Sequence, residues 1–338
     1  MVARRKLGIV GAGWVTAYHL AAWQQLADRV ELVAIADPSL AAAQQRAEAF
    51  GIHRVYPDAR AMLDAEQLDI VDIAAPREFH AELVALAAAR GVDILCQKPL
   101  ATTLSLARQT VAQLPDSTRL MVHENWRFRA WYRQLKQWLE EGVAGEVRQV
   151  SLEFLSSGMI AVDGQRPALL RQPFFRTQPR LLVMEVLIHQ LDTLRYLLGD
   201  MAVVAARIER SNDDIIAEDV ASVTLRCSDS GALVHLTGNL AVHGLPPTPS
   251  DRLRIFGSRG TLELNGNRLQ AFGAVARDEV FDAEAAYQGS YDAAIAHFIE
   301  GLESGGAFET APDDNLQTLQ LVEDIYAMAR FDPARKPL

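Results

Sequence analysis

The sequence has few of the features that mark a secreted, zinc-binding or membrane protein. It has only two cysteines, Cys96 and Cys227, too few for a disulfide framework or a cysteine zinc site. No apolar segment approaches the length that crosses a bilayer. A basic start, Arg4 to Lys6, precedes an apolar run that stops at Gly11, which is too short for a signal peptide. We therefore expect a cytoplasmic protein.

Positive charge is also scarce. The chain has 33 Lys and Arg against 43 Asp and Glu, which gives a net charge of −10. That balance argues against a nucleic-acid partner, whose phosphates basic residues must neutralise, and against an anionic membrane surface. The composition, 49% hydrophobic and 22% charged, is that of a folded globular protein. A length of 338 residues favours two domains.

The first third of the sequence alternates short apolar strands with helices. Strands this apolar, joined by helices, predict a parallel sheet covered on both faces. The predicted strands are 7–10, 31–36, 70–75, 92–96 and 120–123, and the predicted helices are 14–26, 39–50, 78–90 and 104–114.

The pattern changes after residue 123. Longer strands of alternating polarity, joined by turn residues, indicate an open and mostly antiparallel sheet. The predicted strands are 147–155, 203–208, 220–226, 232–240, 252–256 and 261–264, and the predicted helices are 131–141, 182–198, 291–303 and 315–329. We therefore predict an α/β protein with a nucleotide-binding Rossmann domain over 1–123 and an α+β substrate-binding and oligomerisation domain over 124–338.

A glycine-rich turn links the first strand to the first helix. Gly11 suits the tight turn, and Gly13 lets the backbone approach a pyrophosphate at the helix N-terminus, beside Trp14 and Val15. Thr16 stands where Gly or Ala usually allows close packing of helix on strand, so an ordinary glycine turn stays an alternative.

Asp37 ends the second strand, where an acidic side chain can bind the adenosine ribose hydroxyls. A carboxylate there repels a 2′-phosphate, and no Arg follows it immediately, so NAD is favoured over NADP. The alternative is a helix-capping or turn residue before Ser39.

Two further segments follow strands at the same edge of the predicted sheet, where ligands bind in open α/β folds. One is Ala75-Pro76, with His80 one turn later, and the other is Gln97-Lys98. A solvated loop lysine and a surface or helix-capping histidine are the alternatives for Lys98 and His80.

The helix predicted over 182–198 is apolar on most sides. At 100° per residue, Glu185, His189, Asp192 and Tyr196 form a narrow polar stripe, which suggests that the stripe lines a cleft. A helix-stabilising pair between Glu185 and His189, and structural bonds of Asp192, stay open. One histidine and two carboxylates make no recognised ligand set, so we expect no metal.

Taken in order, these motifs resemble the glucose–fructose oxidoreductase / inositol dehydrogenase / rhizopine-catabolism (Gfo/Idh/MocA) family over nearly the whole chain. Asn125-x-Arg127-Phe128 belongs to the same ordered set. The segments 97–101 and 122–125 resemble the D-apiose dehydrogenase branch. Glu185 and Gln97 depart from the family pattern, since many relatives have Asp and Glu there.

The resemblance implies an NAD-dependent dehydrogenase that acts on CH–OH groups of a sugar, sugar derivative or polyol, such as the aldose apiose. It assigns the catalytic roles to Lys98, His189 and Glu185. It implies substrate contacts from Lys98, Arg127, Arg171, Glu185, His189 and Asp192. With the strand-end residues, the predicted cofactor contacts are Gly11, Gly13, Trp14, Val15, Asp37, Ala75, Pro76, His80, Gln97, Lys98 and Asn125.

In the expected reaction, His189 takes the hydroxyl proton and Lys98 stabilises charge on the same oxygen. Arg176 is an alternative to Arg171 for binding sugar hydroxyls. The family also implies a homodimer or homotetramer formed through the C-terminal sheet. Two alternatives share the motifs: a hydrolase or isomerase that uses tightly bound NAD for transient oxidation, and a non-catalytic NAD sensor.

Overall fold

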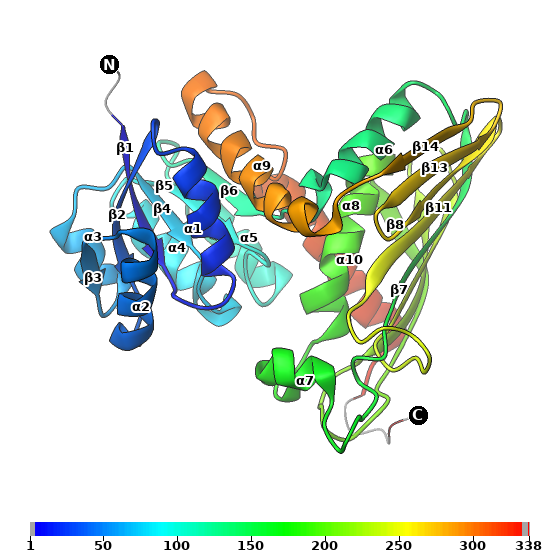
Figure 1. The fold of residues 1–338 in the computed structure, drawn as a ribbon, viewed down its shortest axis with the longest axis horizontal. Coiled ribbons are helices and arrows are strands. Elements are labelled where there is room, and N and C mark those ends of the chain that lie inside the picture. Colours follow the sequence, from blue (N-terminus) through cyan, green and yellow to red (C-terminus); the bar gives the residue numbers. More distant parts are fainter. Residues whose placement is uncertain (1–3, 333–336, 338) are drawn as a thin grey trace. The chain divides into compact units, whose positions relative to one another are not determined.

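The computed structural model describes residues 4–332 and residue 337. The chain divides into two compact units. Unit 1 runs to Phe128 and also contains Tyr287–Leu319. Unit 2 contains Arg129–Ala286 and the chain from Gln320 onward. Each unit is built around its own sheet (Figure 1).

Unit 1 contains the parallel sheet that the apolar strands predict. Its six strands lie in the order β3-β2-β1-β4-β5-β6, and every neighbouring pair is parallel. This is the strand order of a dinucleotide-binding Rossmann domain, with its topological switch between β1 and β4. The strands are β1 (Arg5–Val10), β2 (Val30–Ala36), β3 (Arg54–Tyr56), β4 (Ile70–Ile73), β5 (Asp93–Gln97) and β6 (Leu120–His123).

Helices cover both faces of this sheet because β1 is apolar or glycine on each side. Leu7 and Ile9 pack with residues of α1, whereas a Cβ on Gly8 would lie 2.9 Å from Met62 Cε of α3. Side-chain oxygens of Ser39, Asp58 and Thr103 cap α2, α3 and α5. The helices are α1 (Thr16–Gln25), α2 (Leu40–Phe50), α3 (Ala59–Ala65), η1 (Arg77–Phe79), α4 (His80–Ala88), α5 (Leu104–Ala112) and η2 (Trp126–Phe128).

A segment close to the C-terminus completes the core of unit 1. Helix α9 (Ala283–Ser304) contributes Tyr291, Phe298 and Ile299 to one cluster with Leu7 and Trp23. The compact units therefore differ from the predicted boundary at residue 123, because this helix buries its apolar side chains against the first domain. Sequence order alone does not reveal such a return of the chain.

Unit 2 contains an eight-stranded sheet in the order β14-β13-β12-β11-β7-β10-β9-β8. All neighbouring pairs are antiparallel except β7 and β10, so the sheet is mostly antiparallel, as predicted. The strands are β7 (Val147–Leu155), β8 (Met201–Glu209), β9 (Val220–Cys227), β10 (Leu233–Asn239), β11 (Ser250–Gly257), β12 (Gly260–Asn265), β13 (Arg268–Gly273) and β14 (Arg277–Val280).

Buried and exposed residues alternate along β9, β10 and β11, which gives this sheet one apolar and one polar face. The helical segments of the rest of the chain are α6 (Ala130–Glu140), α7 (Pro167–Arg171), η3 (Pro173–Arg176), the π-helix η4 (Leu182–Leu187), α8 (Ile188–Leu198) and α10 (Pro312–Ala329).

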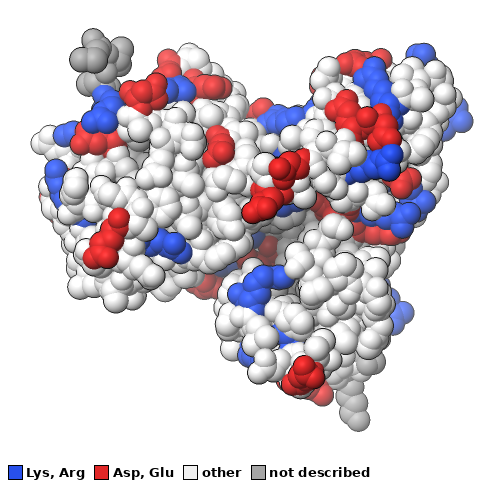
Figure 2. Space-filling model, in the orientation of Figure 1, with Lys and Arg blue, Asp and Glu red and all other residues white. Residues whose placement is uncertain are grey.

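The predicted elements are present, and the bounds of β6 and β7 are as predicted. The short elements β3, α3, η2, α7, η3, β13 and β14 were not predicted. Among residues 4–332, no helix is both long and apolar enough to span a bilayer. On the face drawn in Figure 2, Lys and Arg side chains of the described chain lie among acidic ones and form no broad basic surface.

Candidate active site

The predicted cofactor residues follow the carboxyl ends of neighbouring strands. Gly11 follows β1, Asp37 follows β2, Ala75 lies two residues beyond β4, Lys98 follows β5, and Asn125 lies two residues beyond β6. Because all these strands are parallel, the five residues share one edge of the sheet, which includes the switch between β1 and β4. Ligands of open α/β sheets bind at this edge.

Gly11 has a backbone conformation and surroundings that only glycine tolerates. Its φ is +105°, and an added Cβ would lie 2.5 Å from the carbonyl oxygen of Ala74. Thr16, the first residue of α1, is fully buried, and its hydroxyl donates to the Gly11 carbonyl over 3.1 Å. The threonine thus closes the turn in place of the small residue that is more usual there.

Gly13 and Trp14 lie on the open side of this turn. Both are exposed, and an added Cβ at Gly13 would meet no atom within 4 Å. The first turn of α1 has neither a side-chain cap nor an acidic residue. A helix N-terminus of this kind attracts an anion through its free N–H groups and dipole. The residues present therefore fit the pyrophosphate of a dinucleotide.

Asp37 fastens this turn to the next one. Its Oδ2 accepts a hydrogen bond from the Ala12 N–H over 2.8 Å, and its Oδ1 accepts from the Ser39 N–H over 2.7 Å. The geometry is therefore compatible with both predicted roles of Asp37, a ribose-binding carboxylate and a turn or capping residue. A half-buried carboxylate has about four acceptor positions, so it keeps capacity for ribose hydroxyls while it holds the turn.

His80 ties two strand-end loops together. It is 1% exposed, and its two ring nitrogens lie 2.7 Å from the Pro99 carbonyl oxygen and 2.8 Å from the Ala75 carbonyl oxygen. A carbonyl only accepts, so both bonds form together only when the imidazole carries two protons. The ring thus connects the Ala75 loop to the Lys98 loop.

Gln97 and Lys98 occupy the end of β5. Lys98 is half-buried and is joined to Pro99 by a cis peptide bond. Gln97 is only 8% exposed, and its Oε1 accepts the Lys98 backbone N–H over 2.8 Å. Its Nε2 lies 3.1 Å from His19 Nε2 and 3.4 Å from His123 Nδ1. The polar atoms of Gln97, predicted as a cofactor contact, are thus bonded within unit 1.

Asn125 and Arg127 are also engaged inside unit 1. Asn125 is 2% exposed and donates to the Ser290 hydroxyl over 2.7 Å. Arg127 is 4% exposed and donates to the Glu309 carbonyl and to an Asp314 carboxylate oxygen. These bonds fasten the end of the Rossmann segment to the returning chain and leave little of Arg127 for a substrate.

The predicted helix over 182–198 begins with a π-helix, Leu182–Leu187, and continues as α8. The apolar character of this helix is confirmed in part, since Leu187, Leu191 and Leu194 are fully buried, whereas Leu198 on the same side is half-buried. Leu187 packs on the sheet, because an added Cβ at Gly238 of β10 would lie 2.7 Å from its Cδ1. The π-turn carries more residues per turn than an α-helix, so the predicted 100° spacing does not hold between Glu185 and His189.

The polar stripe is less uniform than predicted. Glu185 and His189 are half-buried, and Asp192 is fully buried. Tyr196 faces α6, where Arg133 donates to its hydroxyl over 2.9 Å and lies over its ring. Any cleft lined by this stripe therefore excludes Tyr196. A π-turn within a helix is often found at functional sites. Glu185 lies in this turn and His189 just after it, which supports their candidate roles.

Glu218 caps the π-helix and was missed from the sequence. It is fully buried, and its Oε1 accepts from the backbone N–H groups of Leu181 and Val183 and from the Tyr326 hydroxyl. Burial raises the pKa of this carboxyl above its ordinary value, although the Tyr326 hydrogen bond opposes the shift. The sequence shows only an acidic residue just before β9, and nothing in it indicates that this residue caps a helix that begins much earlier in the chain.

Arg171 and Arg176 lie on the surface of unit 2. Arg171, at the end of α7, donates to the Thr248 hydroxyl over 3.2 Å. Arg176 lies 4.0 Å from Asp214 and is half exposed. Both guanidinium groups are accessible, unlike that of Arg127.

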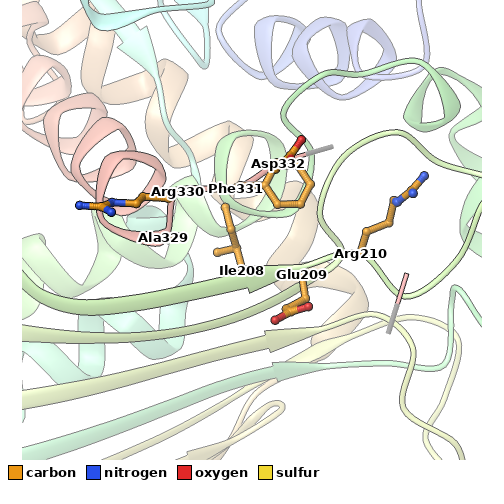
Figure 3. Close-up of a pocket in the computed structure, with 7 residues that line it drawn as sticks. All are labelled: Ile208, Glu209, Arg210, Ala329, Arg330, Phe331 and Asp332. Carbon is orange, nitrogen blue, oxygen red and sulfur yellow. The ribbon is translucent and has the colours of Figure 1, made fainter. Parts of the chain in front are cut away.

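The cavity in Figure 3 contains none of the predicted site residues. Its volume of about 20 Å³ admits about one water molecule. The lining residues come from the ends of β8 and α10 and from the residues that follow them: Ile208, Glu209, Arg210, Ala329, Arg330, Phe331 and Asp332. Within residues 4–332 and 337, no three His, Cys, Asp or Glu side chains are placed to hold a metal.

Comparison with known proteins gives two family matches. Residues 5–125 match an oxidoreductase family with an NAD-binding Rossmann fold, and residues 132–263 match a GFO/IDH/MocA C-terminal domain. A D-apiose dehydrogenase from Paraburkholderia graminis is 36% identical, over 97% of this chain and 88% of the relative. Another from Rhizobium rhizogenes is 32% identical, over 96% of this chain and 95% of the relative.

A similar solved structure is an oxidoreductase from Agrobacterium radiobacter in complex with NAD+, L-tartaric acid and magnesium. It is 32% identical, has a TM-score of 0.88, and covers 97% of both chains.

The two glycines of the turn predict separable effects of substitution. Gly13→Ala should fold with nearly unchanged stability, within about 0.5 kcal/mol, because its Cβ enters open space. It should bind NAD at least about tenfold more weakly, because a pyrophosphate bound at this helix N-terminus would meet the added methyl group. Gly11→Ala should lose about 1–3 kcal/mol of stability through its positive φ alone. Calorimetric titration and urea unfolding measure the two effects, and wild-type NAD affinity in Gly13→Ala would contradict the prediction.

The raised pKa of Glu218 predicts that the free energy of unfolding depends on pH. A raised folded-state pKa means that the folded protein holds the proton more tightly, so this stability is present at low pH and is lost as pH rises through that pKa. Relative to Glu218→Gln, the wild type should therefore lose stability as the pH rises above the ordinary carboxyl pKa of 4.5. Urea unfolding of both proteins over a series of pH values measures the difference.

Glu141→Gln is the matched control for Glu218. Arg277 lowers the pKa of Glu141, so this contribution has the opposite sign, being present at neutral pH and lost on acidification. The stability of the wild type relative to Glu218→Gln should therefore change with pH in the opposite direction to its stability relative to Glu141→Gln. A change in the same direction would refute the raised pKa of Glu218.

Proposed function

This chain belongs to the Gfo/Idh/MocA family of NAD-binding oxidoreductases, and on that premise we propose that it oxidises a hydroxyl group of a sugar, sugar derivative or polyol with NAD. The observation that carries the proposal is the similarity of nearly the whole chain to two D-apiose dehydrogenases, together with a lysine at the ligand edge of the Rossmann sheet. An aldose such as apiose is the first substrate to test.

The glycine turn, Asp37 and the N-terminus of α1 are proposed to hold the cofactor. NAD, when bound, supplies the hydride acceptor. The Asp37 carboxylate would accept hydrogen bonds from ribose hydroxyls and repel a 2′-phosphate, which favours NAD over NADP. Ala75 and Pro76, beyond β4, contribute backbone and ring surface at the same sheet edge.

The proposed chemistry needs one base and one hydrogen-bond donor at the substrate hydroxyl. His189 accepts the hydroxyl proton, since an imidazole titrates near neutral pH. The Lys98 ammonium donates to the same oxygen and stabilises the negative charge that develops there. Glu185 orients His189, and Asp192 and Arg171 bind other hydroxyl groups of the sugar.

The location of the protein in the cytoplasm stays a prediction.

Replacing the two proposed catalytic side chains should separate binding from turnover. Lys98→Met and His189→Ala should each lower kcat by about 10²-fold to 10⁴-fold, because each removes an interaction with the reacting oxygen. NAD affinity should remain close to wild type in His189→Ala. Lys6→Met and His53→Ala, at exposed positions, are the matched controls.

The measurement is NADH formation over a panel of sugars, sugar acids and polyols, with NAD and NADP compared. Near wild-type kcat in both variants would remove the catalytic assignment. Conversion of a sugar without net NADH release would favour the alternative, a hydrolase or isomerase with transient oxidation. Binding of NAD with no conversion of any substrate would favour an NAD sensor.

The polar face of the eight-stranded sheet is proposed to join two copies of the chain. Its centre carries half-buried side chains, Ser151 and Glu153 on β7, His235 and Thr237 on β10, and Arg254 on β11. Arg254 lies 4.0 Å from Glu153, so these two charges on this face are paired with each other. A two-fold interface brings the same residues together from both copies.

Thr237→Asp should therefore weaken the assembly, since it adds a carboxylate from each copy to the centre of the proposed interface. Light scattering after gel filtration should show the mass falling towards the 37.2 kDa of one chain. Gln113→Asp, at an exposed position of unit 1, is the control and should keep the wild-type mass. A monomeric wild type would refute the proposal.

A further inference from the structure

A buried polar network lies directly behind the Lys98 turn. It joins His19 of α1, Asp72 of β4, Gln97 of β5 and His123 of β6. His19, Asp72 and His123 are fully buried, and Gln97 is 8% exposed. Buried polar groups are costly unless their donors and acceptors match, so the protonation of each member is constrained by its neighbours.

The backbone of Lys98 fixes which way the Gln97 amide points. The Lys98 N–H lies 2.8 Å from Gln97 Oε1, and a backbone N–H can only donate. The amide oxygen must therefore face Lys98, and the NH₂ group must face the two histidines. This removes the usual ambiguity between the oxygen and nitrogen of a glutamine side chain.

The Gln97 orientation in turn fixes the His19 tautomer. An NH₂ group facing His19 Nε2 at 3.1 Å requires a bare nitrogen there, because two donors would oppose each other. The ring proton is therefore on Nδ1, which donates to Asp72 Oδ2 over 2.8 Å. Trp23 Nε1, also only a donor, lies 2.7 Å from the same oxygen. Asp72 Oδ2 thus accepts twice, as a carboxylate does.

The same NH₂ group faces the second histidine. His123 Nδ1 lies 3.4 Å from Gln97 Nε2 and is a bare nitrogen for the same reason. Every bond of the network thus has one direction, from the Lys98 N–H and the Gln97 amide hydrogens towards acceptors, and from His19 towards Asp72. An imidazolium at His19 does not fit this arrangement.

We propose that Gln97 is a positioning residue that holds the Lys98 turn by bridging its backbone N–H to a neutral, Nδ1-protonated His19. The turn is fastened on its other side by His80, which bonds to the Pro99 carbonyl. The importance of the turn for turnover rests on the proposed function, because that function assigns Lys98 to the substrate oxygen. The protonation pattern does not rest on it.

A glutamate at position 97 would test the neutrality of this residue. One carboxylate oxygen would still accept the Lys98 N–H, but the other would place lone pairs against the bare nitrogens of His19 and His123. Relief requires one proton from solvent, taken up either by the new carboxyl group or by His19 Nε2. Glutamate therefore keeps the acceptor and loses the donors, whereas methionine keeps the volume and loses both.

The titratable groups that face this site come from five elements. They are His19 of α1, Asp72 of β4, Cys96 of β5, His123 of β6 and Tyr291 of α9. Burial and the Asp72 charge raise the pKa of the Cys96 thiol, which therefore stays protonated. His80 and the Lys98 side chain lie at the same turn, so each variant is compared with the wild type at every pH.

The direct test is the nitrogen NMR spectrum of protein labelled with ¹⁵N-histidine, with His19→Asn used to assign the His19 signals. In the wild type, His19 should show a protonated Nδ1 and a bare Nε2. A protonated Nε2 or a charged imidazolium in the wild type would overturn the proposal. This readout needs no substrate, so it remains decisive even if the proposed dehydrogenase activity fails.

Kinetics test the positioning role separately. Gln97→Met should lower kcat on the order of 100-fold at every pH, as expected for a reacting group displaced by about 1 Å, with little change in KM for NAD. Gln97→Glu should show a similar loss at alkaline pH and recover as the pH falls, because the added proton restores a donor between positions 97 and 19.

The matched control is Gln113→Glu, the same change at an exposed position of unit 1, which should leave both kcat and its pH profile unchanged. A raised KM for NAD with unchanged kcat in the Gln97 variants would instead make Gln97 a direct cofactor contact. The first result would overturn the positioning role. Wild-type kcat in Gln97→Glu at all pH values would show that the acceptor alone suffices, and would overturn the proposed bridge to His19.

Discussion

A parallel sheet buried on both faces confines polar chemistry to its edges. The strands of unit 1 are so apolar that a charged side chain within them must be paired, and Asp72 in the middle of β4 receives both His19 and Trp23. The other candidate site residues follow the carboxyl ends of the strands. The glycine turn, the Asp37 carboxylate and the Lys98 turn gather at one edge for this reason.

The same requirement for partners explains why several conspicuous polar residues are not free to bind ligands. His80, Asn125 and Arg127 each bond to groups that close loops or fasten the returning C-terminal segment. Their side chains hold the loops on which Lys98 and the cofactor edge depend. A polar residue in a sequence motif can therefore act by holding the loops of the site in place, and not only by touching a ligand.

The sequence was sufficient to predict the two sheets, because apolar runs and alternating patterns report burial directly. It also located Gly11, Asp37 and Lys98 at strand ends. It did not reveal that α9 returns to unit 1, because an amphipathic helix does not specify which core it covers. The π-turn was also hidden, since its cap, Glu218, lies more than thirty residues away and acts through backbone N–H groups.

At position 97, the buried neighbours distinguish glutamine from glutamate by their hydrogen bonds. Glutamine and glutamate have nearly the same shape, and both can accept the Lys98 N–H. Only the amide also donates, and two bare imidazole nitrogens require donors there. Because the network already holds the Asp72 carboxylate, a second buried negative charge would have to be neutralised by a proton. The choice of residue at 97 thus determines how many protons the network binds and whether the Lys98 turn depends on pH.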